Sequence, residues 1–235
     1  MITIPPSLVD VIRGNAGVGH VHCITNGFEP ADFPVKLAPT VPVNDRVRIS
    51  YTGVWRPGYG LEDLYRAVRL LMERRSPHLK RLLVDAAGFR PGPARQFGVE
   101  DVIVEHGAVP HQVALDLMNA ADALYLPVPL GYYAKASLPG KLFEYLGSGR
   151  PILAVVPADS EVARVAGDVE GTLRIEPGDV PALAGAIESL CSGAEAGLFA
   201  PRRPEQLAAY TRAATTRALA GVFDQALHQG VGTAR

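Results

Sequence analysis

Apolar and polar positions alternate along this chain in a regular succession of strand-like and helix-like patterns. Short apolar runs predict buried strands at 47–52, 79–87, 102–104, 123–126, 151–156 and 172–175. Apolar residues spaced by three and four predict helices at 61–74, 111–121, 137–147, 179–191 and 204–228. Because strands and helices alternate, the pattern predicts an α/β fold: a Rossmann-like parallel sheet sandwiched by helices, with a long C-terminal helix.

The segment before this pattern differs in composition, since residues 29–44 are rich in proline. We therefore expect three parts. Residues 1–45 form a linker-like lead-in with a first strand, residues 46–200 form a Rossmann-like domain, and residues 201–235 form the C-terminal helix. Ligands of such sheets bind outside the carboxyl ends of the strands, so the loops that follow the strands are the places to search.

Composition narrows the classes of function. The 235 residues are 48% apolar, which is enough for a folded core. Lys and Arg number 23 against 24 Asp and Glu, so the net charge of -1 argues against non-specific nucleic-acid binding. The longest apolar run, at 152–156, is too short to cross a bilayer. Two distant cysteines exclude a disulfide framework or a zinc site and predict a cytoplasmic protein.

The richest chemistry lies around the helix predicted from residue 137. Ser137 is its expected N-cap and Pro139 lies in its first turn, so the free amides there form an anion site. Lys141 adds a charge, and Glu144 projects from the same face, where its carboxylate could bind a ribose diol. The alternative is that Lys141 and Glu144 form an ordinary solvated ion pair.

A second candidate is the glycine-rich loop 53–60 after the first strand of this domain. Gly53 allows close backbone approach, and Arg56 could bind a diphosphate. The loop matches no dinucleotide or Walker fingerprint, so a plain connection with a surface arginine is equally compatible. His106 could line a base pocket. The sequence contains no Asp-x-Asp pair that would hold a metal.

Five segments together carry a family resemblance. They are ITNGF (24–28), ISYTG (49–53), HGAVP (106–110), MNAADAL (118–124) and KLFEYLGSGRPI (141–152). This ordered succession resembles the C-terminal domain of group 1 (family 4) retaining glycosyltransferases, which is one half of a GT-B fold. The resemblance covers nearly the whole chain and implies a glycosyltransferase that takes a nucleoside-diphosphate sugar as donor, with no cofactor and no metal.

The resemblance also implies roles for individual residues. Glu144 would hold the ribose, while Lys141 and Arg56 would face the diphosphate as the catalytic cations. The other implied donor-binding residues are Ser137, Leu138, Pro139, Gly140, Gly53, Tyr59, Val109, Gly131 and Lys135. Two positions depart from the family pattern: many members carry a glutamate where this chain has Ala136, and Lys-Gly where it has Tyr59-Gly60. Lys135 would partly compensate.

A GT-B enzyme has two Rossmann-like halves, and the resemblance implies that the acceptor-binding half is absent. It is expected to precede Met1 or to be a separate subunit, and it could bring the protein to a membrane surface. The chain alone should bind donor but transfer a hexosyl group poorly. The alternatives are a non-catalytic assembly or regulatory protein and, with less support, a sugar-nucleotide epimerase.

Overall fold

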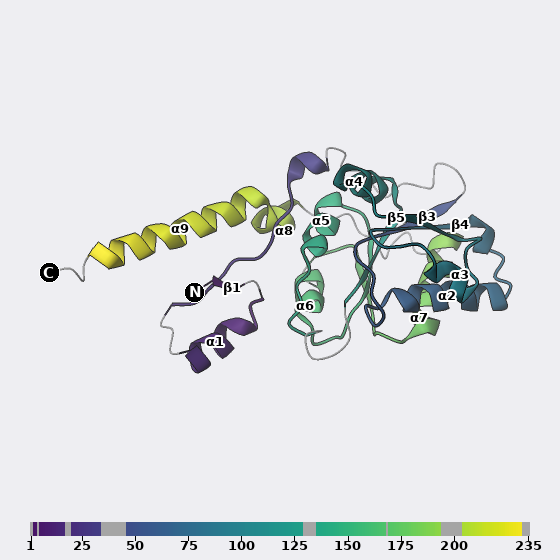
Figure 1. Cartoon of the computed structure of the whole chain (residues 1–235), viewed down its shortest axis with the longest axis horizontal. Helices are drawn as coiled ribbons and strands as arrows, with labels where there is room; N and C mark the ends of the chain where they lie inside the picture. The colour runs from purple at the N-terminus through teal and green to yellow at the C-terminus, as the bar shows by residue number, and fades with distance from the viewer. Residues whose placement is uncertain are drawn as a thin grey trace.

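The computed structural model describes residues 2–3, 5–16, 20–33, 46–128, 135–167, 169–193 and 204–231. Its centre is a six-stranded parallel sheet with strand order β5–β4–β3–β6–β7–β8 (Figure 1). The strands are β3 (Val47–Thr52), β4 (Leu82–Ala87), β5 (Ile103–Gly107), β6 (Ala123–Pro127), β7 (Ile152–Val155) and β8 (Thr172–Ile175). The order reverses between β3 and β6, so the topological switch point lies at their carboxyl ends.

Helices cover both faces of this sheet. One face packs on α2 (Leu61–Glu73), α3 (Pro93–Phe97) and α7 (Val180–Ser192). The other face packs on α4 (His111–Ala120), α5 (Gly140–Ser148) and α6 (Glu161–Gly167). Successive side chains of a strand point to opposite faces, and in β6 both sets are apolar. Tyr125 enters the first core, while Leu124 and Leu126 enter the second.

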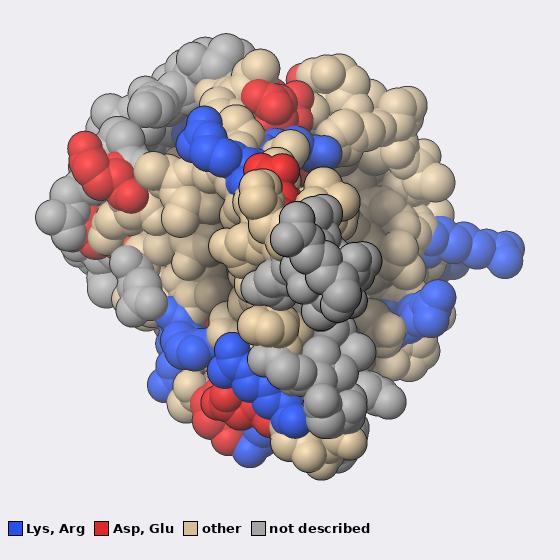
Figure 2. All heavy atoms as spheres, turned by 90° about the vertical axis from the view of Figure 1, so that its left-hand side faces the viewer, with Lys and Arg blue, Asp and Glu red and all other residues tan. Residues whose placement is uncertain are grey.

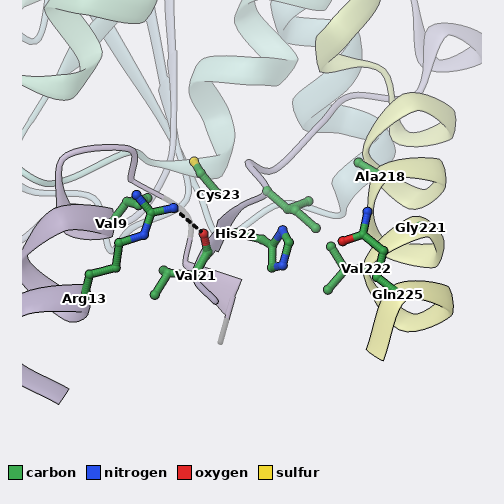
Figure 3. A pocket seen from close by; sticks show the side chains of 10 residues that line it. Val9, Arg13, Val21, His22, Cys23, Ala218, Gly221, Val222 and Gln225 are labelled. Carbon is green, nitrogen blue, oxygen red and sulfur yellow. Dashed lines mark hydrogen bonds between the residues drawn. The ribbon is translucent and has the colours of Figure 1, made fainter. Parts of the chain in front are cut away.

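A second group of elements, here called the peripheral unit, lies beside the main sheet. It consists of β1 (Ile2–Thr3), α1 (Leu8–Ala16), β2 (His22–Cys23) and α9 (Arg212–Val231). Strands β1 and β2 form their own two-stranded parallel sheet, and α9 runs away from the main sheet (Figure 1). A groove of about 460 Å³ lies between α1, the β2 region and α9 (Figure 3).

Two stretches of chain connect the peripheral unit to the main body, and they are hydrogen-bonded to each other. The first contains Phe28 and η1 (Pro30–Asp32); the second contains α8 (Pro204–Leu207), η3 (Ala208–Tyr210) and Thr211. The Phe28 amide donates to the Tyr210 carbonyl at 2.9 Å, and the Arg212 amide donates to the Phe28 carbonyl at 2.8 Å. These bonds make a parallel bridge between Phe28 and Thr211.

The fold class predicted from the sequence is confirmed, but several element boundaries differ. Residues 79–87 contain a short 3₁₀ helix, η2 (Leu79–Arg81), before β4. The helix predicted at 204–228 is interrupted because Thr211 is extended and caps α9 with its side chain, which accepts from the Ala214 amide at 3.2 Å. The apolar pattern also missed the short elements β1, α1, α3 and α6.

The surface carries both signs of charge. Acidic and basic side chains are interspersed on the face shown in Figure 2. Within the described part of the chain, no helix is both long and apolar enough to cross a membrane. No group of three or more His, Cys, Asp or Glu side chains in that part could hold a metal ion.

Candidate functional site

Glycines bring three strand ends close together at the carboxyl edge of the sheet. The Gly53 amide donates to the Ala87 carbonyl at 2.8 Å, and the Gly88 amide donates to the Gly107 carbonyl at 2.8 Å. Gly88 has a φ of +101°, and a Cβ there would lie 2.6 Å from the Gly53 carbonyl oxygen. Only glycine therefore allows the loops after β3 and β4 to approach this closely.

Lys141 extends from the first turn of α5 to the end of β3. Its Nζ lies 3.3 Å from the Tyr51 hydroxyl and 4.4 Å from the centroid of the Tyr51 ring. A Cβ on Gly53 would lie 2.1 Å from the same Nζ, so the missing side chain makes room for the ammonium. The structure thus brings together Lys141 and Gly53, two residues predicted for the site, next to the topological switch point.

The Lys141 ammonium has no carboxylate partner at ion-pair distance among the described residues. Burial lowers the pKa of Lys141 to about 8, an effect that the Glu144 carboxylate partly opposes. The Tyr51 hydroxyl donates to the Val54 carbonyl at 2.9 Å, and burial raises the pKa of this tyrosine, so it stays neutral. The solvated Lys141–Glu144 pair considered from the sequence is not formed, and the arrangement suits an incoming anion.

The N-terminus of α5 begins later than the sequence pattern predicts. The helix starts at Gly140, and its N-cap residue is Pro139, which makes no side-chain capping bond. Ser137 is therefore not the N-cap, because Pro139 itself adopts the extended cap conformation. The first bond of this turn runs from the Leu142 amide to the Pro139 carbonyl at 3.0 Å. The amides of Gly140 and Lys141 precede it, where helix N-termini bind anions.

Tyrosine hydroxyls fix the elements around this site. The Tyr145 hydroxyl on α5 accepts from the Thr52 amide at 3.0 Å, which holds the helix against the end of β3. The Tyr125 hydroxyl donates to the Gly60 carbonyl at 2.6 Å and anchors the far end of loop 53–60. Glu144 lies one turn after Lys141 and remains partly exposed, so its carboxylate is accessible from the same side.

The other predicted residues occupy varied places. Arg56 is exposed at the tip of loop 53–60, where its carbonyl accepts from the Tyr59 amide at 3.0 Å. Leu138 is buried, and Val109 is partly buried after β5. The Lys135 ammonium pairs with the Asp159 carboxylate on the surface. Gly131 lies outside the described residues.

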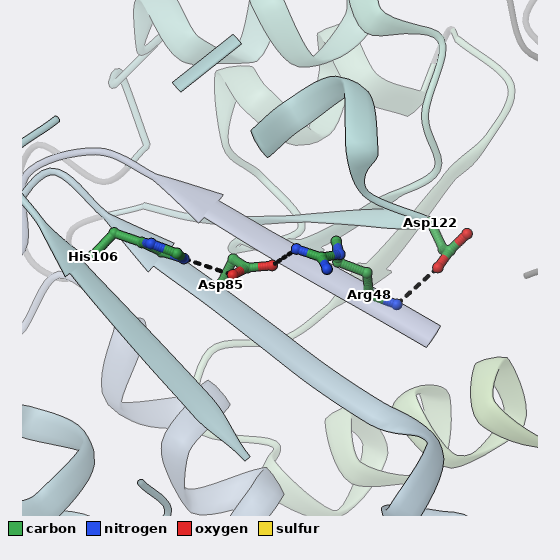
Figure 4. A network of polar contacts seen from close by, with 4 residues as sticks. All are labelled: Arg48, Asp85, His106 and Asp122. Carbon is green, nitrogen blue, oxygen red and sulfur yellow. Dashed lines mark hydrogen bonds and ion pairs between the residues drawn. The ribbon is translucent and has the colours of Figure 1, made fainter. Parts of the chain in front are cut away.

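A polar network that the sequence pattern missed lies across β3, β4 and β5 (Figure 4). The buried Asp85 carboxylate meets the His106 Nε2 and the Arg48 guanidinium, each at 2.6 Å. The Arg48 amide donates to Asp122 at 2.8 Å. His106 is the next-to-last residue of β5, so Asp85 orients a side chain just before the loop at 108–110. An acidic residue inside an otherwise apolar strand is the signal that could have revealed this network.

Comparison with solved structures finds the same fold in several known proteins. Sucrose-phosphate synthase from Thermosynechococcus elongatus is 19% identical with a TM-score of 0.70, over 97% of this chain and 58% of that one. A glycosyltransferase from Rickettsia africae is 13% identical with a TM-score of 0.66, over 96% and 63% respectively. An α,α-trehalose 6-phosphate synthase from Burkholderia multivorans is 12% identical with a TM-score of 0.62, over 92% of this chain and 52% of that one.

These structures share the fold of this chain, and the chain spans about half to two thirds of their lengths. A search of curated protein sequences gives no significant match. Residues 46–193 match the family described as "Glycosyl transferases group 1", which is more than half of the chain. The chain therefore belongs to the group 1 glycosyl transferases and has the Rossmann-like fold of a GT-B domain.

Proposed function

We propose that this chain is the donor-binding domain of a retaining hexosyltransferase and that its donor is a nucleoside-diphosphate sugar. The observation that carries the proposal is the Lys141 ammonium, held beside Gly53 without a carboxylate partner among the described residues. A diphosphate would supply the missing negative charge. The amides at the start of α5 would add hydrogen bonds to the same phosphate oxygens.

The proposed chemistry follows from these charges. When the bond between the sugar and the diphosphate breaks, its electron pair stays on the diphosphate. An acceptor hydroxyl forms the new bond to the sugar, and its proton passes to an oxygen of the leaving diphosphate. Lys141 and the α5 amides would stabilise the leaving charge as fixed groups, so no metal is required. Glu144 would bind the ribose diol, Arg56 would reach the phosphates from the tip of its loop, and backbone near Val109 would contact the base.

The acceptor site is proposed to lie on a second half that this chain does not contain. Support comes from the solved structures, which extend well beyond the matched region. That half could be part of the same protein or a separate subunit. We place the protein in the cytoplasm, with any contact to a membrane made through the second half.

A non-catalytic role in assembly or regulation is the second candidate, because Ala136 stands where many family members carry a glutamate. The two proposals differ in an observable way. A donor-binding domain binds a nucleoside diphosphate, and an enzyme consumes the nucleotide-sugar once the second half is present. A scaffold protein purified from its native host would carry an unrelated partner with it and would show no affinity for nucleotides.

Binding of a nucleoside diphosphate should depend on Glu144 through the ribose, whichever base the nucleotide carries. We expect Glu144→Ala to weaken UDP, GDP or ADP binding by about 10-fold or more, because two hydrogen bonds to a charged acceptor are lost. The affinity for inorganic pyrophosphate, which has no ribose, should be unchanged. Isothermal titration measures both, with Glu73→Ala on α2 as an exposed control. Equal losses of affinity for pyrophosphate and for nucleotide would show that Glu144 does not bind the ribose.

The same binding should weaken as the pH rises. Because burial lowers the Lys141 pKa to about 8, the ammonium is mostly charged at pH 7 and mostly neutral at pH 9. The dissociation constant of a nucleoside diphosphate should therefore rise about tenfold between these two pH values. In Lys141→Arg the guanidinium stays charged, so the dissociation constant of this variant should not rise tenfold between pH 7 and pH 9. A wild-type affinity that stays constant to pH 9.5 would contradict the proposed contact.

A further inference from the structure

Asn26, in the stretch that joins β2 to the main body, lies beside the N-terminus of α5. A Cβ built on Gly140 would be 3.6 Å from the Asn26 Nδ2. Asn26 is exposed, so its side chain is accessible to a ligand. An amide nitrogen at this position can donate toward the same space as the Gly140 and Lys141 amides.

The backbone around Asn26 is held firmly in this place. Gly27 packs against η3, since a Cβ there would lie 2.7 Å from the Tyr210 carbonyl oxygen. Phe28 is buried and lies against α5, where a Cβ on Gly147 would be 2.4 Å from its ring. The neighbours of Asn26 in sequence therefore hold it at the beginning of α5: Gly27 packs on η3, and Phe28 packs on the last turns of α5.

A second contact ties the segment before α1 to the first residue of α6. The Ser7 amide donates to the buried Glu161 carboxylate at 2.8 Å. The Glu161 amide in turn donates to the Lys135 carbonyl at 2.8 Å. Ser7, which precedes α1, is therefore linked through Glu161 to Lys135, which precedes α5 in the chain.

We propose that Asn26 is a further anion-binding residue of this site, whose side-chain amide donates to the phosphate received by α5. This inference rests on the proposed function, because it takes the phosphate site of the donor as its ligand. Its consequence is that a bound phosphate contacts the connecting stretch as well as the main body. Occupancy of the site then adds a further restraint to the junction with the peripheral unit.

Inorganic pyrophosphate is the suitable probe, because it tests the phosphate contacts without any base or ribose. We expect Asn26→Ala to weaken pyrophosphate and UDP binding by about tenfold or more, the loss typical of one hydrogen bond to a charged group. Asn26→Asp should weaken both further, because a carboxylate repels the anion. Gln112→Ala removes an exposed amide from α4 and should leave both affinities unchanged.

A role for Asn26 as a simple cap of α5 predicts a different pattern. A cap would make Asn26→Ala lower the thermal midpoint, whereas Asn26→Asp would preserve it, since aspartate caps helices equally well. We expect the midpoints of both variants to match wild type, and pyrophosphate to slow amide exchange in residues 24–28 of wild type but not of Asn26→Ala. Unchanged affinity in Asn26→Ala, with wild type still binding, overturns this inference alone. Absence of binding by wild type overturns the proposed function with it.

Discussion

Replacing Lys141 with methionine should weaken nucleoside-diphosphate binding by about 10- to 100-fold, or roughly 1.5–3 kcal/mol. Methionine keeps an apolar stem of similar length against the Tyr51 ring but removes the ammonium that would meet the phosphates. The Lys141 ammonium forms no ion pair with a carboxylate among the described residues. The substitution therefore leaves none of these carboxylates without its partner. Isothermal titration with UDP, GDP and ADP measures the loss.

The control for this variant is Lys80→Met, which removes an exposed lysine from η2. Its nucleotide affinity should equal that of wild type. Thermal unfolding of Lys141→Met should occur at or above the wild-type midpoint, since a buried cation is replaced by an apolar side chain. A folded Lys141→Met protein with full affinity would show that the diphosphate binds elsewhere.

Gly88→Ala should lower the free energy of unfolding by about 3 kcal/mol, the largest stability effect that we expect from adding one methyl group. Two costs combine at this position. The φ of +101° strains any residue with a Cβ, and that Cβ would lie 2.6 Å from the Gly53 carbonyl oxygen. The loops after β3 and β4 must then separate. Denaturant unfolding monitored by circular dichroism gives the difference.

Gly178→Ala separates the two costs. Gly178 has a φ of +83°, but nothing lies within 4 Å of a Cβ built there. This variant should therefore lose only about 1 kcal/mol, the part that comes from backbone strain. If Gly88→Ala and Gly178→Ala lower the free energy of unfolding by the same amount, the close approach of the two loops adds nothing to the cost of Gly88→Ala. Gly88→Ala should also weaken nucleotide binding, because Gly53 borders the Lys141 ammonium.

Much of the main sheet could be predicted because its strands are buried on both faces. In a parallel sheet such strands appear as continuous apolar runs, as in 123–126 and 151–156. Short helices such as α3 and α6 offer too few turns for a clear apolar periodicity. The interruption at Thr211 was missed because the bridge to Phe28 comes from a segment far away in sequence.

The candidate site was predicted in part for a similar reason. Lys141 and Glu144 belong to one local pattern, so their sequence spacing placed them on the same helix face. The contact of Lys141 with Tyr51 and Gly53 joins α5 to β3. These residues lie far apart in the sequence, so a local pattern cannot predict their contact. Asp85, His106 and Arg48 likewise meet only when three strands align. The start of α5 shifted because Pro139, rather than Ser137, supplies the cap.

The chain passes between the main body and the peripheral unit twice, and the two passages are joined backbone to backbone at Phe28 and Thr211. A single covalent passage would act as a swivel, with rotation about its own bonds. Two passages fastened together act instead as a hinge, because twisting one requires the other to follow. Any bend of the peripheral unit about this line is therefore expected to break the hydrogen bond from the Ser7 amide to the Glu161 carboxylate as well.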